Sequence, residues 1–189
     1  MQKKYEFTGE TKVWCGITLR RIRAAIDFTL KSGIKVTKGE EGGWIEKEEN
    51  LSHTDSAWVC GNAEVYGDAR VYGNAKVYGD AKVYGNAWVC GNAEVYGNAE
   101  VYGNAEVFGD ARVERASDVI WFKNIWSSGR TFTYTRSNRK WAVGCFYGTG
   151  EELIKKAYAD SEKSGKCYEA IVRATEEIYK AMEEKEVEK

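Results

Sequence analysis

The chain has 189 residues, and its 28 Lys and Arg against 29 Asp and Glu leave a net charge of −1. This balance argues against a polycationic protein that binds nucleic acid through its overall charge, although a local basic site is compatible with it. No run of about 18 apolar residues is present to span a membrane, and Met1–Glu6 lacks the apolar stretch of a signal peptide. Five cysteines without a C-x-x-C pair favour a reduced, cytoplasmic protein.

Residues 1–50 contain no repeat, and we expect them to form a small α+β cap. Five apolar residues have the spacing of an amphipathic helix: Ile17, Leu19, Ile22, Ile26 and Leu30. Short strands are expected at Tyr5–Thr8 and Ile34–Thr37, and Gly42-Gly43 is expected to form a turn. We expect this segment to cap the β-helix predicted from residue 51 onward, because the open end of a β-helix exposes unpaired backbone groups.

From Ala57 onward the sequence is built from hexads of the form A-x-V-Y-G-N/D. Eleven copies follow one another without an insertion, and the last, degraded copy begins at Ser117. Such periodicity predicts a parallel β-helix, because each repeat can bury its apolar face only by stacking on its neighbours. Ala and Val point to the same side of a short strand and fill a narrow interior, while Gly-Asn or Gly-Asp turns the chain. The predicted fold is therefore mainly β, with a β-helix over residues 51–122 and small α+β regions at both ends.

Three hexads are expected to make one triangular coil, so that residues 18 apart lie above one another at roughly 4.8 Å. The outward positions then fall into three columns: Glu64, Lys82 and Glu100; Arg70, Trp88 and Glu106; and Trp58, Lys76, Glu94 and Arg112. Stacked tyrosines and charges of alternating sign stabilise such columns. The outward aromatic surface is larger than a monomer usually exposes, so other subunits or the flanking segments are expected to cover part of it. We therefore expect a homotrimer, an assembly common among hexapeptide β-helices.

The sequence has one histidine, His53, just before the first full hexad. Hexapeptide β-helices include acyltransferases that use a CoA donor and a histidine general base. Counting back six residues from Val59 places His53 at an inward-facing position of the end coil, which favours a structural role. No Ser/His/Asp set, carboxylate dyad, phosphate loop or metal-ligand cluster is evident, and no cofactor is implied. An acyltransferase that uses His53 is the alternative to a binding protein.

Residues 123–149 carry five basic side chains and no acidic one. The basic residues are Lys123, Arg130, Arg136, Arg139 and Lys140, and six aromatic residues, among them Trp126, Tyr134 and Trp141, are interleaved with them. Guanidinium groups pair with phosphate and aromatic rings stack on bases, so this composition suits an anionic, ring-bearing ligand. We predict that Arg130, Arg136, Arg139 and Lys140 hold phosphates and that Trp126, Tyr134 or Trp141 stacks the base. The alternative is a basic hairpin that packs against the acidic β-helix.

Residues 123–189 are expected to form a β-hairpin followed by two helices. Alternation in Thr131–Thr135 and in Trp141–Val143 predicts two strands that turn near Ser137-Asn138. Thr149-Gly150-Glu151-Glu152 is a capping box that opens a helix to about Ala157. A loop is expected at Ser161–Lys166, and a second helix over about Tyr168–Glu184.

Three stretches outside the repeat carry a family resemblance. They are Lys4–Lys12, then Gly42–Glu46 leading to Asn50–Ser52, and finally Gly144–Thr149. Together with the G-N-A-x-V-Y array, they resemble phage- and prophage-encoded hexapeptide-repeat proteins of bacteria. The resemblance implies a left-handed β-helix with a small cap at each end, made in the cytoplasm of an infected or lysogenic cell. It supplies no catalytic residues, because a shared fold does not establish an activity.

These observations lead us to expect a non-enzymatic accessory protein that binds a partner. In a phage-infected cell, the expected partner is a nucleotide-like immune signal or a host defence protein. In a trimer, the basic hairpin of one subunit would lie beside the β-helix wall of the next, and clefts between subunits often hold small molecules. A structural component of the virion is a further alternative, and no membrane association is expected.

Overall fold

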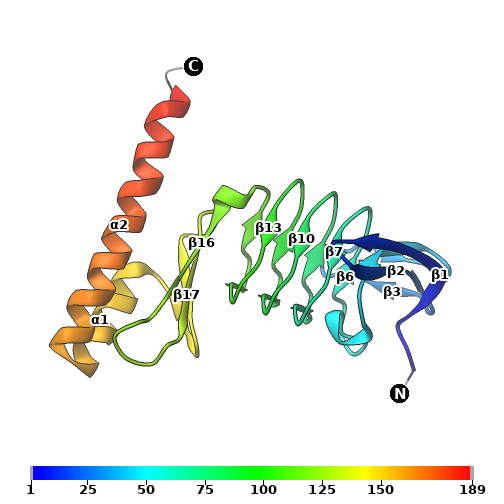
Figure 1. The fold of residues 1–189 in the computed structure, drawn as a ribbon, viewed down its shortest axis with the longest axis horizontal. Coiled ribbons are helices and arrows are strands. Elements are labelled where there is room, and N and C mark those ends of the chain that lie inside the picture. Colours follow the sequence, from blue (N-terminus) through cyan, green and yellow to red (C-terminus); the bar gives the residue numbers. More distant parts are fainter. Residues whose placement is uncertain (1, 188–189) are drawn as a thin grey trace.

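The computed structural model describes residues 2–187, with side chains through residue 183. Three parts follow one another along the long axis of the molecule: an N-terminal cap, a stack of coils, and a C-terminal sheet that carries two helices (Figure 1). The predicted mainly β fold with a parallel β-solenoid is confirmed.

Each full hexad from Ala57 contributes one two-residue strand to the solenoid. The strands are β6 (Trp58–Val59), β7 (Glu64–Val65), β8 (Arg70–Val71), β9 (Lys76–Val77), β10 (Lys82–Val83), β11 (Trp88–Val89), β12 (Glu94–Val95), β13 (Glu100–Val101), β14 (Glu106–Val107) and β15 (Arg112–Val113). They pair in parallel with the strands 18 residues away, so that Lys82 lies between Glu64 and Glu100. The other two columns follow the same register. The predicted three-hexad coil is therefore confirmed.

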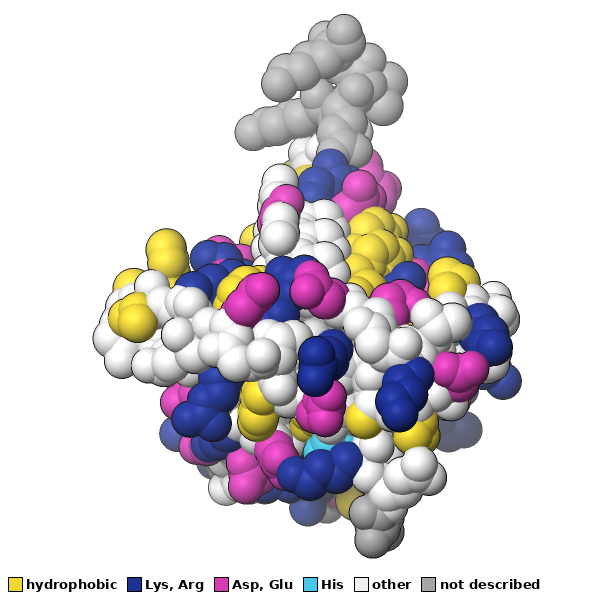
Figure 2. Space-filling model, turned by 90° about the vertical axis from the view of Figure 1, so that its right-hand side faces the viewer, with side chains coloured by type: hydrophobic (Ala, Val, Ile, Leu, Met, Phe, Trp, Pro, Cys, Tyr) yellow, Lys and Arg dark blue, Asp and Glu magenta, His cyan; other side chains and the backbone are white. Residues whose placement is uncertain are grey.

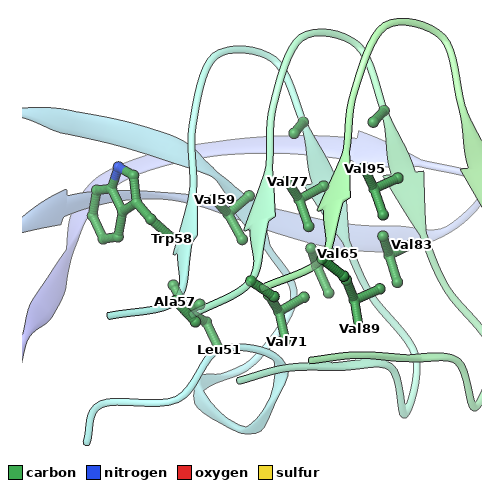
Figure 3. Close-up of a cluster of buried hydrophobic side chains, with 14 of the residues drawn as sticks. Leu51, Ala57, Trp58, Val59, Val65, Val71, Val77, Val83, Val89 and Val95 are labelled. Atoms are coloured by element: carbon green, nitrogen blue, oxygen red, sulfur yellow. The ribbon is translucent and has the colours of Figure 1, made fainter. Parts of the chain in front are cut away.

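The interior of the solenoid is filled by the Ala and Val side chains of the repeat. Each of them from Ala57 to Val113 is at most 1% exposed. Val59, Val77 and Val95 point inward one above the other, with Val65 and Val83 on the next wall (Figure 3). The narrow interior selects these two residue types, because a longer side chain would force neighbouring coils apart.

The corners of the coils depend on the repeated Gly-Asn or Gly-Asp pair. From Gly61 to Gly109 these glycines have φ between 63° and 73°, a region that costs an L-residue about 1–2 kcal/mol. The side chains that follow them form hydrogen-bonded ladders along the stack. Asn74 Nδ2 donates to Asn92 Oδ1 at 3.0 Å, and Asn92 Nδ2 donates to Asp110 Oδ1 at 2.9 Å. The corners are thus fixed by backbone conformation and by contacts between coils.

The N-terminal cap is built from strands, and the helix expected over Ile17–Leu30 is wrong. β1 (Tyr5–Trp14) and β2 (Ile17–Ala24) form an antiparallel hairpin. Its tip is Cys15-Gly16, with φ of 47° and 81°, which suits a two-residue turn. The pairing of β2 shifts register between Arg21 and Arg23. That irregularity places Leu19 and Ile22, three residues apart, both in buried positions, so a bulged strand imitates helical spacing.

The expected turn at Gly42-Gly43 is also wrong, because both glycines belong to β5 (Glu41–Ile45). β5 pairs antiparallel with β2 and parallel with β7, so the cap continues the solenoid's first sheet. A Cβ on Gly42 would lie 2.8 Å from the Val59 carbonyl oxygen, and one on Gly43 would lie 2.7 Å from that of Ala63. Glycine is needed here for close backbone approach rather than for turning.

The cap also closes the open end of the first coil. Lys4 is almost fully buried, and its Nζ donates to the carbonyl oxygens of Asp55, at 2.9 Å, and Ala57, at 2.6 Å. Burial lowers the pKa of Lys4 to about 8. The cap's short hairpin of β3 (Phe28–Thr29) and β4 (Lys35–Val36) covers Trp58, whose ring meets the Phe28 ring edge-on at 5.2 Å. Seen from this end, acidic and basic side chains are interspersed over the cap (Figure 2).

At the other end, the eleventh hexad leaves the stack. A 3-10 turn flanks the solenoid at each end: η1 (Glu48–Asn50) precedes the first coil, and η2 (Ala116–Asp118) follows the last. Directly after η2, β16 (Val119–Lys123) starts a separate antiparallel sheet. The sheet continues with β17 (Thr131–Thr135), β18 (Lys140–Val143) and β19 (Phe146–Gly148) in sequence order. The predicted hairpin of Thr131–Thr135 with Trp141–Val143 is confirmed. The Thr133 hydroxyl accepts the Glu106 N–H at 2.9 Å and so satisfies the exposed end of β14.

The two C-terminal helices pack on the other face of this sheet. α1 (Gly150–Asp160) begins at the predicted capping box, where the Thr149 hydroxyl accepts the Glu152 N–H. α2 (Glu162–Val187) begins earlier than expected, and the predicted loop at Ser161–Lys166 is wrong. The Ser161 hydroxyl accepts the Ser164 N–H at 3.1 Å, so Ser161 caps α2 and leaves a sharp corner between the helices.

Candidate functional site

Four of the seven predicted ligand-binding residues line one hollow between the β17–β18 hairpin and α2. They are Tyr134, Arg136, Arg139 and Trp141, and the hollow has a volume of about 320 Å³. Gly150 and four α2 residues, Glu176, Tyr179, Lys180 and Glu183, complete its lining. We call this site the hairpin hollow. The hairpin turn places two arginines at its rim, because residues 136–139 connect the two strands.

The other three predicted residues lie elsewhere. Trp126 packs against Phe132 and Tyr168, with ring centroids 5.7 Å away in each case. Arg130 lines a separate hollow of about 40 Å³ next to Lys156. Lys140 is on β18 and does not line the hairpin hollow. The hydrogen bonds from Thr149 are the main reason that the pKa of Glu152 is lowered, and the charge of Lys140 adds to this effect. The sequence segment 123–149 therefore does not fold into a single basic surface.

The aromatic residues of the hairpin hollow form its floor and belong to the core beneath α1 and α2. Trp141 is 1% exposed and Tyr134 is 9% exposed. The Tyr134 ring contacts both Trp141, at 5.1 Å, and Tyr179, at 5.3 Å, with tilts near 45°. Their ring faces are thus occupied by one another, and the structure does not present them as an open platform for stacking. Burial raises the pKa of Tyr134 and raises that of Tyr179 to about 12, so both hydroxyls stay protonated at neutral pH.

The charged side chains of the hairpin hollow lie at its rim. Arg136 Nη2 is 3.5 Å from Glu183 Oε1, and its guanidinium lies 5.7 Å from the centroid of the Tyr179 ring. Arg139 is exposed, and within the described part of the chain no ion pair is recorded for its side chain. Its φ of 54° is unusual for a residue other than glycine. The hairpin turn therefore holds Arg139 at the rim in a defined backbone conformation.

A second hollow, of about 410 Å³, adjoins the first on the side of the solenoid. It shares Arg136, Arg139 and Glu183 with the hairpin hollow. Its further lining is Tyr96, Arg112, Glu114, Arg115, Asp118 and Ser137. The Asp118 carboxylate accepts the backbone N–H groups of Glu114 and Arg115, at 3.0 and 2.9 Å, and so is engaged locally. Four arginines from two separate segments converge around these joined hollows.

Sequence reasoning missed the contributions of α2 and of the last coil. Glu176, Tyr179, Lys180 and Glu183 recur at helical spacing, so one face of the expected second helix was visible in the sequence. Nothing in the sequence placed that face against the hairpin. Arg112 belongs to β15, the last strand of the solenoid, and Arg115 follows that strand. Both border the site only because the terminal sheet folds back over the end of the solenoid.

His53 is not in the inward-facing position that the hexad count gives it. Leu51 forms the bridge to Val71 and is 1% exposed, so Leu51 occupies the interior there. The His53 Nδ1 accepts the Lys4 N–H at 3.2 Å, and Nε2 lies 3.9 Å from Glu48 Oε2. Burial lowers the pKa of His53. The ring joins the cap to the residues before the first coil.

A larger hollow, of about 560 Å³, lies along the wall formed by β9, β12 and β15. Several of its polar side chains already have hydrogen-bond partners. The Asn74–Asn92–Asp110 ladder forms one side, and the Tyr78 hydroxyl donates to Glu94 Oε2 at 3.1 Å on the other. This pairing makes the wall a weaker candidate for ligand binding than the hairpin hollow.

No group of three His, Cys, Asp or Glu side chains that could hold a metal ion is found in the described residues. None of the helices within residues 2–187 is long and apolar enough to cross a membrane.

The repeat is similar to a known family. Residues 63–79 match the family model described as YdcK Beta solenoid repeat. That segment is one coil of the structure, because it contains β7, β8 and β9. A comparison with curated proteins gives no match. The family match and the stacked coils together show that the chain is a β-solenoid repeat protein.

Proposed function

We propose that this protein is a binding scaffold that holds a small anionic ligand at the hairpin hollow. The observation that supports this most strongly is the convergence of Arg136 and Arg139 with Lys180 of α2 around one concave site. Guanidinium groups form paired hydrogen bonds with phosphate oxygens, and such charged bonds are among the strongest in proteins. Arg112 and Arg115 in the adjoining hollow extend the basic rim toward the solenoid.

The size of the hollow restricts the ligand. A volume of about 320 Å³ is at the lower end of the range for small-molecule sites, roughly 300–1,000 Å³. A mononucleotide-like molecule suits this space better than an oligonucleotide. The organic part would meet the edges of Tyr134 and Tyr179, which are 9% and 7% exposed, rather than stack on Trp141, which is 1% exposed.

The acidic residues of the rim also fit a binding role. Glu176 and Glu183 face the hollow beside the basic groups, and Glu183 is paired with Arg136. A phosphate that enters would compete with Glu183 for Arg136, which lowers affinity for weakly charged anions. Selection for a strongly charged ligand follows from this competition.

The resemblance of the flanking motifs to phage- and prophage-encoded hexapeptide-repeat proteins suggests the setting. In an infected bacterium, a protein of this kind would sequester a nucleotide-like immune signal. The same basic rim would suit an acidic host defence protein, and that partner is the second candidate.

Calorimetry against a panel of cyclic and linear nucleotides tests the ligand. The best variant is Arg139→Asn, because Asn removes the charge and tolerates the φ of 54°. One lost charged hydrogen bond is worth about 1.5–3 kcal/mol, so binding should weaken by roughly 10- to 150-fold. Arg130→Ala is the matched control, because Arg130 lies in the same basic segment but outside this hollow.

Absence of heat with every nucleotide would exclude the nucleotide proposal and leave the host-protein version. Equal losses for Arg139→Asn and Arg130→Ala would show that binding depends on net charge and not on the hairpin hollow.

A further inference from the structure

The three walls of the solenoid are not equivalent in how their outward residues are covered. The first wall carries the β1–β2 hairpin, where Lys12 pairs with Glu64 at 2.7 Å and Lys82 lies 4.1 Å from the Trp14 ring centroid. On the third wall, Trp58 is buried beneath Phe28. The second wall consists of β8, β11 and β14, and Trp88 at its centre is 39% exposed.

The outward side chains of this second wall are Arg70, Trp88 and Glu106, one on each successive coil. Val71 and Val89, the next residues along the chain, point into the interior (Figure 3), so Arg70 and Trp88 point away from it. Trp88 pairs in register with Arg70 on one side and with Glu106 on the other. Arg70 and Glu106 are thus two coils apart, about 9–10 Å, with the indole between them.

The charges on the second wall lack the partners that most charges on the other two walls have. Glu64 is paired with Lys12, and both Glu94 and Glu100 accept tyrosine hydroxyls. For Arg70 and Glu106, no ion pair or side-chain hydrogen bond is recorded within the described side chains. Glu106 is also half-buried, which makes an unpaired carboxylate costly there.

The order of these three residues is self-complementary. In a two-fold pair of antiparallel solenoids, the column that runs Arg70, Trp88, Glu106 on one subunit lies against the same column running in the opposite direction on the other. Each Arg70 then faces a Glu106, and the two Trp88 rings meet at the axis. In a parallel pair the same column would place Arg70 against Arg70 and Glu106 against Glu106. The first wall, with Glu64, Lys82 and Glu100, places like charges together in either orientation.

We infer that the second wall is the interface of an antiparallel homodimer with its two-fold axis at Trp88. Isologous contacts of this kind close after two subunits, because each residue meets its complement on the same patch. In the row beside the charged column, the same register would place Tyr72 opposite Phe108. This arrangement is an alternative to the predicted homotrimer as a way of covering the exposed aromatic surface. The wall is separate from the hairpin hollow, so the two proposals can fail independently.

Sedimentation velocity of the full chain at micromolar concentration tests the inference. The expected species has twice the 21.3 kDa mass of one chain. Arg70→Glu alone and Glu106→Arg alone each create two like-charge contacts in the antiparallel dimer, and each should weaken the dimer at least about tenfold. The double variant Arg70→Glu/Glu106→Arg restores opposite charges and should recover the dimer.

A zero-length carbodiimide cross-link gives the register directly. In Arg70→Lys, the new amine should link to Glu106 of the second copy, and peptide mass spectrometry of the dimer band should identify that pair. Lys76→Glu, a charge reversal on the third wall, is the control and should leave the dimer unchanged. A monomer, a trimer, or a dimer that loses nothing in Arg70→Glu would each overturn the inference.

Discussion

The imidazole of His53 lies flat on the phenol ring of Tyr5, with ring centroids 4.0 Å apart and ring planes 14° apart. The two residues belong to different parts of the chain, the first cap strand and the segment that leads into the first coil. Tyr5 in turn donates its hydroxyl to the Leu51 carbonyl oxygen at 2.8 Å. This stack therefore fastens the cap to the solenoid at the point where the regular repeat begins.

The partial burial of His53 in the folded chain predicts a pH dependence of stability. Burial lowers its pKa below the usual 6.5, so below pH 6.5 the unfolded chain binds more protons at this site than the folded chain. The free energy of unfolding should therefore fall as the pH falls below about 6.5. His53→Gln removes the titrating group, and its melting temperature should decline less between pH 7.5 and pH 5. Equal declines in both proteins would contradict this assignment.

Two glycines with nearly the same φ separate the cost of backbone strain from the cost of crowding. Gly91 has φ of 70°, and a Cβ there would lie 2.8 Å from the Gly109 nitrogen. Gly129 has φ of 67°, with nothing within 4 Å of such a Cβ. Gly129→Ala should cost about 1–2 kcal/mol from strain alone. Gly91→Ala should cost a further 1–3 kcal/mol, roughly, because neighbouring coils must move apart. Chemical denaturation measures both, and equal costs would refute the crowding argument.

Two tryptophans at the same position of the hexad should differ sharply in importance. Trp58 is 1% exposed beneath the cap, whereas Trp88 is 39% exposed on the second wall. Trp58→Ala should lower the free energy of unfolding by about 3–5 kcal/mol, the usual cost of emptying a large buried site. Trp88→Ala should cost less than about 1 kcal/mol when measured at a concentration where the chain is monomeric. A large loss for Trp88→Ala under those conditions would show that a part of the same chain covers it.

The corner ladder can be tested with a nearly isosteric change. Asn92 accepts a hydrogen bond from Asn74 and donates one to Asp110. Asn92→Asp keeps the acceptor but replaces the donor with a second carboxylate beside Asp110. The variant should be less stable by about 1–2 kcal/mol at pH 7. Asn104→Asp is the control, because Asn104 is exposed at a corner and its recorded ladder role among the described residues is to accept from Asn86, which an aspartate preserves. Similar losses in both would exclude the ladder as the cause.

Sequence periodicity determined the solenoid. Each hexad has Ala and Val two residues apart and a glycine at a fixed interval. Along ten consecutive strands, stacking in coils is the only way to bury both side chains. The pairing of Trp88 with Arg70 therefore follows from the 18-residue spacing alone. The two C-terminal strands and the capped start of α1 followed from equally local signals. In each case, neighbouring residues contain the whole physical reason.

Only the tertiary structure decided which side chains other segments of the chain bury. The spacing of Leu19 and Ile22 is satisfied equally by a helix and by a bulged strand, and only pairing with β1 and β5 selects the strand. Trp58 and Trp88 are indistinguishable in the repeat, and only the position of Phe28 buries one of them. Trp141 and Arg139 lie two residues apart in the basic segment, yet packing of the helices makes one part of the core and leaves the other at the rim of a hollow. Contacts between residues far apart in the chain made these choices, and composition alone does not encode them.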